Sequence, residues 1–226
     1  MNSKDQVNRR NRVGDRGRSI GIKNRQDMNL GGVLLLSLIL LLFPINAADA
    51  IVRDFRISPE EPVQGDVVKI LIEADPCEEL PVTISFEDVV AVSNRKYEYD
   101  LDDVNVPPIP TNNFTVRAEN VKNLRVSVRI FGFWVTKSAK AKDGVATVSQ
   151  SNVPGGRSYD VRIHGDAAEG ASTVTLNMTA STKICTDRNG EYEYSYDTSC
   201  IPPGEFTVKV GELAKTVTLH EHGNSV

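Results

Sequence analysis

The feature that most constrains the fold is an alternation of apolar and polar residues in short runs after residue 50. A period of two places successive side chains on opposite faces of a strand, so it predicts half-buried β-strands. Val, Ile, Thr and Tyr dominate the runs, and Gly, Pro, Asn and Asp separate them about every 8 to 12 residues. The clearest runs are 67–74, 82–87, 113–121, 123–131, 144–150, 158–165, 172–180 and 214–220. The sequence therefore predicts an all-β chain.

Three strand pairs share an order of residues that marks an internal repeat. In 97–118 and in 192–210, Tyr-Glu-Tyr stands ten residues before the first proline of a Pro-Pro pair, and Phe-Thr-Val follows the prolines. Residues 144–163 form a weaker copy. Because proline has no N–H for a ladder and a fixed φ, we expect each copy to be strand, bend and strand. The first prolines of the bends, 47 and 48 residues apart, are Pro107, Pro154 and Pro202.

A repeat of about 47 residues is too small to bury a core alone, so its strands are expected to pair with those of other repeats. We predict two tandem antiparallel β-sandwiches, at 51–131 and at 132–222, with a short tail at 223–226. A single sandwich built from all three repeats is the alternative.

Residues 1–50 are expected to be a leader outside this fold. Residues 1–28 carry eight Lys or Arg against three Asp, and an unbroken apolar run at 30–43 follows them. The small residues Ala48 and Ala50 come next. A basic flank, an apolar segment and an Ala-x-Ala site are typical of a secretory signal peptide.

The alternative for this segment is an uncleaved signal anchor over 30–46, which is short of the ~20 apolar residues that a spanning helix needs. Met28 lies just before the apolar run and is the expected translation start. With either fate the positive flank stays inside, so residues 51–226 are expected to be exported to the cell surface or the extracellular space. The membrane is then a partner only through an uncleaved leader.

Charge excludes one class of partner for the exported part. The whole chain has a net charge of −4, but residues 1–28 contribute +5 and Asp49 contributes −1, which leaves −8 on residues 51–226. Nucleic-acid affinity rests on Lys and Arg that neutralise phosphates, so an acidic body of this kind is not expected to bind nucleic acid.

The chain contains three cysteines, which are Cys77, Cys185 and Cys200. In an exported chain one disulfide is expected, and Cys185–Cys200 is the nearer pair. If the Asp-Arg-Asn-Gly sequence at 187–190 is a tight hairpin turn, Cys185 faces residue 192, and the bond has to join different strands or sheets. Cys77 is left either free or as the true partner of one of the others.

Two Asn-x-Thr sequences are candidate glycosylation sites in an exported protein, at Asn113 and Asn177. Both lie in or beside expected strands, so each asparagine must face solvent to be modified.

Catalytic, cofactor and metal sites are not expected. The chain has neither Gly-x-Ser-x-Gly nor His-Glu-x-x-His. His220-Glu-His222 is expected to be a solvated tail, the 187–190 sequence an ordinary turn, and the acidic stretch 98–103 a solvated face, with a metal ion as the alternative at each. Trp134, the one tryptophan, is expected to pack in a core or interface; the alternative is an exposed contact for a sugar or a partner protein.

Two segments resemble modules of archaeal, methanogen-type exported surface proteins. They are "SPEEPVQGD" at 58–66 and "NGEYEYSYDTSCIPPGEFTVKVGELAKTVTL" at 189–219. The resemblance implies immunoglobulin-like β-sandwiches, a surface location and a scaffold or adhesive role, and it brings no catalytic residues.

The functional expectation is a non-enzymatic structural or adhesive protein of the cell envelope. Its expected partners are other envelope proteins or further copies of itself, joined through open sheet edges. The alternative is an extracellular ligand-binding module for carbohydrate or Ca²⁺.

Overall fold

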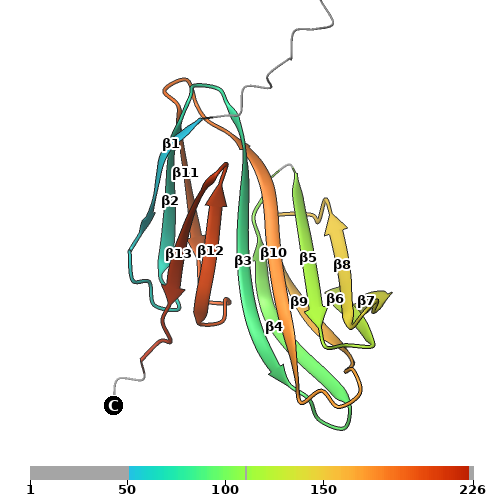
Figure 1. Ribbon diagram of the computed structural model, residues 1–226. Coiled ribbons are helices and arrows are strands. Elements are labelled where there is room, and N and C mark those ends of the chain that lie inside the picture. The colour runs from blue at the N-terminus through green and yellow to red at the C-terminus, as the bar shows by residue number, and fades with distance from the viewer. Residues whose placement is uncertain (1–50, 110, 224–226) are drawn as a thin grey trace, which may run out of the picture. The chain divides into compact units, whose positions relative to one another are not determined.

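The computed structural model describes residues 51–109 and 111–223, and within these ranges the chain forms strands and no helix (Figure 1). The all-β prediction is confirmed. The expected leader and the last three residues of the tail lie outside the described ranges. Within those ranges no helix is long and apolar enough to cross a membrane. The strands are β1 Val52–Ser58, β2 Val67–Ala74, β3 Glu79–Ala91, β4 Lys96–Val106, β5 Asn112–Glu119, β6 Asn123–Ile130, β7 Phe133–Lys140, β8 Val145–Ser151, β9 Arg157–Asp166, β10 Thr173–Cys185, β11 Glu191–Asp197, β12 Gly204–Val210 and β13 Leu213–Leu219.

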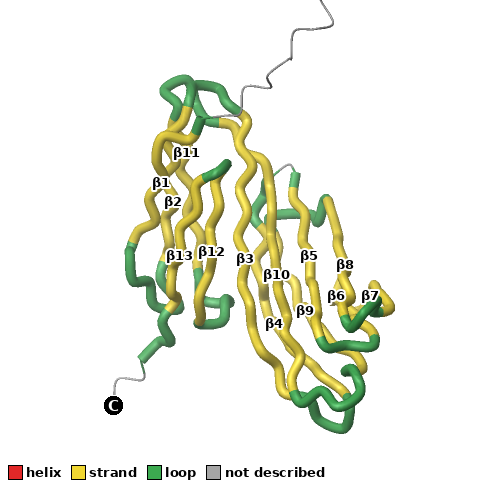
Figure 2. The backbone as a smooth tube through the Cα atoms, viewed as in Figure 1, coloured by secondary structure: helices red, strands yellow, loops and turns green. Residues whose placement is uncertain are grey.

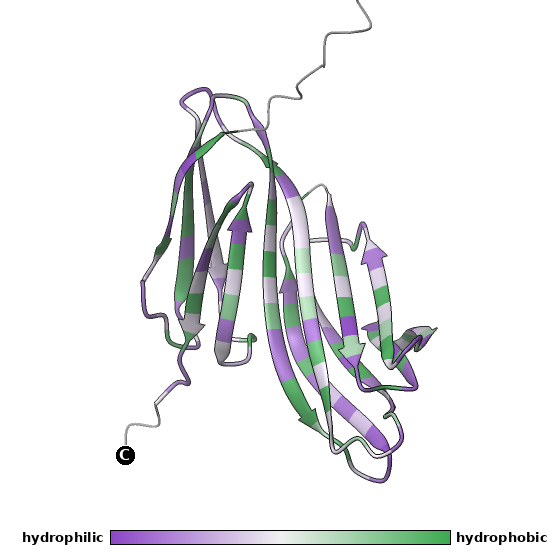
Figure 3. Ribbon diagram, in the orientation of Figure 1, coloured by the Kyte–Doolittle hydropathy of each residue, from purple (hydrophilic) through white to green (hydrophobic). Residues whose placement is uncertain are grey.

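The strands form three antiparallel sheets. A central sheet of six strands has the order β13-β12-β3-β10-β5-β8. Two smaller sheets have the orders β1-β2-β11 and β4-β9-β6-β7. Figure 2 shows how loops join these strands, and Figure 3 shows the alternation of apolar and polar residues along them.

Both small sheets pack on the same face of the central sheet and make two hydrophobic cores. The β1-β2-β11 sheet buries Phe55 and Ile72 against residues of the central sheet that include Ile184. The β4-β9-β6-β7 sheet buries Leu124 and Ile163 against residues that include Leu176. Leu176 and Ile184 are an even number of residues apart on β10, so they point to the same face.

The central strands β3 and β10 connect the two cores. Each has 13 residues, and they are paired along their whole length, from Thr173 opposite Ala91 to Cys185 opposite Glu79. The predicted boundary after residue 131 falls in the turn of the β6–β7 hairpin. Each core takes strands from both sides of that boundary, so the two cores are not consecutive in the sequence.

The three repeats are strand, bend and strand, and each bend carries the chain from one layer to the other. The first repeat leaves a small sheet in β4 and enters the central sheet in β5. The second runs the opposite way, from β8 to β9, and the third passes from β11 into β12. A proline at each bend suits this role, because it ends pairing in one sheet before the chain crosses to the other.

Candidate ligand-binding groove

The middle of the central sheet is covered by neither small sheet. The strands β11 and β4 are edge strands of their sheets. Side chains of both strands and of the central sheet line one cavity of about 430 Å³. This cavity, called the groove below, is within the ~300–1,000 Å³ usual for small-molecule sites.

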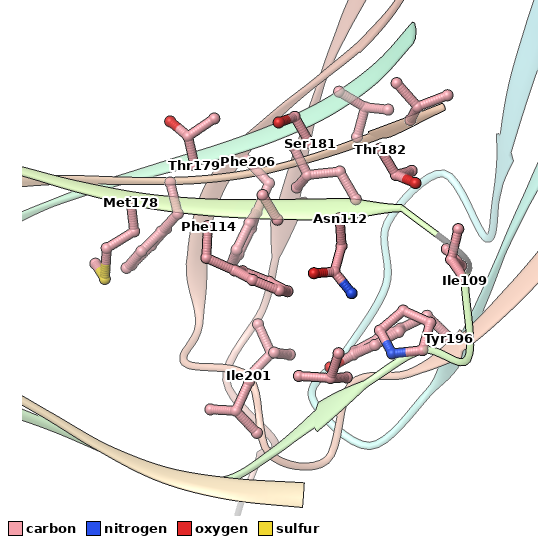
Figure 4. Close-up of a pocket in the computed structure, with 18 of the residues that line it drawn as sticks. Ile109, Asn112, Phe114, Met178, Thr179, Ser181, Thr182, Tyr196, Ile201 and Phe206 are labelled. Carbon is pink, nitrogen blue, oxygen red and sulfur yellow. The ribbon is translucent and has the colours of Figure 1, made fainter. Parts of the chain in front are cut away.

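The floor of the groove is the apolar face of the central sheet. Ala180, in the middle of β10, lies opposite Ile84 on one side and Phe114 on the other. The rings of Phe86 and Phe206 stack there with centroids 4.7 Å apart. Figure 4 shows Phe114 and Phe206 pointing into the same space as residues of the bends.

The walls are the inward faces of the two edge strands. Alternation along β11 turns its three tyrosines inward. On β4 a register shift between Leu101 and Val104 keeps both residues on the inward face, although they are three residues apart. These wall residues are Tyr192, Tyr194, Tyr196, Leu101, Val104 and Val106. The Tyr196 hydroxyl donates a 2.9 Å hydrogen bond to the Asn105 carbonyl, which links the two strands.

The rim is formed by the proline bends of the three repeats. They contribute Pro107, Ile109, Val153, Ile201 and Pro202 to the lining. The first two bends touch, since the Gly156 N–H donates to the Val106 carbonyl at 2.8 Å.

The side chain of Asn112 fixes the second bend to the start of β5. Its Nδ2 donates to the Val153 carbonyl, and its Oδ1 accepts from the Val153 N–H, both at 2.8 Å. The polar atoms of this rim residue are thus engaged with the backbone, which leaves the groove free for apolar contact.

The groove carries no charge in the described part of the chain: its lining contains none of the Asp, Glu, Lys, Arg or His side chains. Burial raises the pKa of Tyr196 to about 12, and burial also raises the pKa values of Tyr192 and Tyr194. The three phenols therefore stay neutral at physiological pH. A neutral, mostly apolar hollow suits an apolar molecule.

The structure does not bring Cys185 and Cys200 together. All three cysteines are free and exposed. Cys185 lies before the first residue of β11 and Cys200 lies after its last residue, so the length of this strand separates them. Seven strand residues span roughly 20 Å, which is well beyond the reach of a disulfide. Cys77 is near the Cys185 end, because its N–H donates to the Asp187 carbonyl at 3.0 Å.

Asn113 and Asn177 both lie on the outer face of the central sheet, away from the groove. Each is half-buried and bonded to the threonine of its own Asn-x-Thr sequence. Asn113 Nδ2 donates to Thr115 Oγ1, and Thr179 Oγ1 donates to Asn177 Oδ1, both at 3.1 Å. Glycosylation at these residues stays a prediction.

The other candidates are spread over the surface. His220 and His222 are exposed, and among the described residues no group of three acidic, His or Cys side chains is placed to hold a metal ion. The sequence at 187–190 forms a turn, with Asp187 Oδ1 accepting the N–H groups of Asn189 and Glu191 at 2.8 and 2.9 Å. These bonds hold the pKa of Asp187 below its usual value.

The expected packing of Trp134 is not observed. Trp134 lies in the β6–β7 hairpin, is 45% exposed, and has the Arg162 guanidinium over its ring at 5.2 Å. Pairing of β6 with β9 ends at Val128 and Val161, so Trp134 lies where the hairpin has separated from β9 and is covered only in part, by Arg162.

Sequence reasoning missed the groove and strand β7. The groove residues come from segments about 100 residues apart, such as Val104 and Ile201, and alternation does not say which strands face each other. One signal was present: the repeated prolines, taken as scaffold, mark the segments that form the rim.

Comparison of the chain with protein-family models, with curated proteins and with solved structures finds no match.

Proposed function

We propose that this chain is a non-enzymatic, exported binding protein that holds one elongated apolar molecule, with an alkyl or isoprenoid chain, in the groove. The observation that carries the proposal is the uncharged, mostly apolar lining of a 430 Å³ hollow between two edge strands. Apolar surface that stays in contact with water is unfavourable, and a molecule bound in the groove would cover it.

The energetics favour a chain-like ligand. Each methylene removed from water contributes about 0.8 kcal/mol, so a ligand gains affinity in proportion to the chain length that the groove encloses. A carbohydrate would have to leave most of its hydroxyls without partners along this lining, and Ca²⁺ requires oxygen ligands with negative charge. Within the ligand-binding alternative, an apolar molecule is therefore the better occupant.

A structural or adhesive role is the second candidate. The ends of the three sheets are β13, β8, β1, β11, β4 and β7, and edge strands can pair with other chains. β7 is exposed along almost all of its length. Chains that associate through such edges would show a concentration-dependent mass by light scattering, whereas a carrier of one apolar molecule would stay monomeric.

Export, the archaeal resemblance and the immunoglobulin-like character of the cores remain part of the proposal. They are supported by the order of basic flank, apolar run and Ala-x-Ala in the leader and by the segments at 58–66 and 189–219.

The proposal is tested by titrating the protein with a fluorescent long-chain fatty acid. We expect one saturable site, displaced by an unlabelled long-chain alcohol. Ala180→Trp places a large ring on the groove floor and is expected to abolish binding. Thr207→Trp is the matched control, because Thr207 is exposed on the outer face of the same sheet. Equal binding by the two variants would refute the groove as the site.

A further inference from the structure

The tip of the β6–β7 hairpin exposes five large apolar side chains within six residues. Phe131 is 87% exposed, Phe133 is 77% exposed and Trp134 is 45% exposed. Ile130 and Val135 are exposed beside them. Single exposed apolar residues are common on proteins, but two phenylalanines and a tryptophan exposed on the two faces of one hairpin tip mark a contact surface. We call residues 130–135 the hairpin tip.

The hairpin tip lies beyond the part of β6 that pairs with β9. Strand β9 pairs with the Arg125–Val128 part of β6. The β6–β7 ladder continues past this point to the pair of Ile130 and Phe133. Phe131 and Phe133 are therefore largely exposed, whereas Trp134 is covered on one side by Arg162 of β9.

The turn at the tip contains a residue that its backbone disfavours. Phe131 has φ 49° and Gly132 has φ 84°, which is the pattern of a type I′ turn. Asn, Asp and Gly are preferred at such positions, and a bulky side chain costs stability there. Because its ring is almost fully exposed, Phe131 gains little packing within the folded chain to offset this cost. A contact outside the chain would supply the missing gain.

The hairpin and its flanking residues are opposite in charge to the rest of the exported part. Arg129 is next to the tip, whereas Lys122, Lys140 and Lys142 are at the other end of the ladder. Residues 122–142 contain six Lys or Arg and no Asp or Glu, so the hairpin with its flanking residues carries +6 and the remainder of residues 51–226 carries −14. Among the described residues, Arg125 and Arg129 form ion pairs with Asp166 and Asp160 at 3.6 and 3.5 Å. The lysines are in no ion pair within the described ranges; they are Lys122, Lys137, Lys140 and Lys142.

We propose that the β6–β7 hairpin docks the protein on an anionic lipid bilayer, with its tip inserted at the level of the headgroups. Trp and Phe side chains favour this interface, and the net positive charge of the hairpin is drawn to anionic headgroups. A protein partner fits less well, because lysine is depleted in protein–protein interfaces, whereas its long apolar stem suits a lipid surface. The inference stands on the hairpin alone and does not require a ligand in the groove.

The test uses the fluorescence of Trp134, which is the only tryptophan of the full-length chain and lies in the tip. The full-length protein is mixed with phosphatidylcholine vesicles that either lack or contain phosphatidylserine, with bromine on the acyl chains as a quencher. We expect a blue shift and quenching with the anionic vesicles and a much smaller response with the neutral ones. Raised salt should weaken the response, because it screens the lysines and arginines.

Phe131→Asn is the decisive variant. Asparagine tolerates the positive φ, so the variant should unfold at the same or a higher denaturant concentration than the wild type. Its vesicle affinity, read from Trp134, should fall roughly 10-fold or more with the loss of one phenylalanine from the lipid surface. Leu213→Ser is the matched control, because Leu213 is an exposed apolar residue on another sheet, and its replacement should leave the affinity unchanged.

The apolar run at 30–43 can hold the full-length protein on vesicles by itself, so co-sedimentation is recorded separately from fluorescence. Protein that sediments with anionic vesicles while Trp134 remains unquenched would overturn the proposal. Equal quenching by neutral and anionic vesicles, or equal affinity of Phe131→Asn and the wild type, would do the same. A Trp134 response to a protein or a sugar but not to anionic vesicles would assign the hairpin to that partner instead.

Discussion

The contact between the first two proline bends is tested by Gly155→Ala. A Cβ at Gly155 would lie 2.2 Å from the Pro107 carbonyl oxygen, 2.7 Å from the Pro108 Cα and 2.8 Å from the Pro107 carbonyl carbon. All three are backbone atoms, so no side-chain rotation relieves the overlap. To reach the 3.4 Å of ordinary contact, the bends must separate by about 1.2 Å. Strain of this kind costs typically 1–3 kcal/mol.

The assay is equilibrium unfolding in urea, with Gly223→Ala as the control because a Cβ at Gly223 meets nothing within 4 Å. We expect Gly155→Ala to lower the free energy of unfolding by about 1–3 kcal/mol and the control to change it by less than ~0.5 kcal/mol. Since both bends line the rim, Gly155→Ala should also weaken binding in the groove. A stability within ~0.5 kcal/mol of the wild type would refute the close approach of the two bends.

Three further predictions address the cores, the surface and the ligand. Leu80→Ala in one core and Leu124→Ala in the other should each lower the free energy of unfolding by about 2–5 kcal/mol. Each variant should still unfold in a single urea transition, because β3 and β10 span both cores. Two separate transitions would contradict the shared sheet. Burial, reinforced by Arg125, lowers the pKa of His164 below its ordinary 6.5, so protonation favours the unfolded chain. The free energy of unfolding should therefore fall as the pH drops below about 6.5. Denaturant unfolding at pH 7 and at pH 5 should show a smaller fall for His164→Gln than for the wild type. The same pH dependence in both proteins would rule out this role for His164. In competition titrations with unlabelled alcohols of increasing length, every two added methylenes should lower the Kd by roughly 15-fold until the groove is full. A Kd that does not depend on chain length would contradict an apolar site.

Local structure was largely readable from the sequence. Alternation located most of the strands, and the prolines located the three bends. The strand ends were harder: the run 82–87 belongs to a strand that extends from Glu79 to Ala91. The added residues are paired with β10 along the whole strand, and pairing partners are set by tertiary contacts that a period of two does not encode.

The arrangement of strands was not readable in the same way. A division at residue 131 assumes that neighbouring strands in the sequence share a core, but β3 pairs with β10 and β12. Alternation also assigns an inward face to every strand without saying whether anything covers it. Trp134 and Ala180 are two residues whose faces no strand covers, one in the β6–β7 hairpin and the other on the floor of the groove.

The most direct test of the groove as the binding site is to locate a bound ligand by NMR. The methyl groups of Met178, Ala180 and Ile201 line the groove and can be labelled, and Thr207 on the outer face of the sheet provides a reference methyl. A long-chain fatty acid that carries a nitroxide near its methyl end is added at one equivalent. The account predicts strong broadening of the three groove methyls and little change at Thr207. Broadening that is uniform over these methyls, or absent from all of them while the ligand is bound, would contradict it.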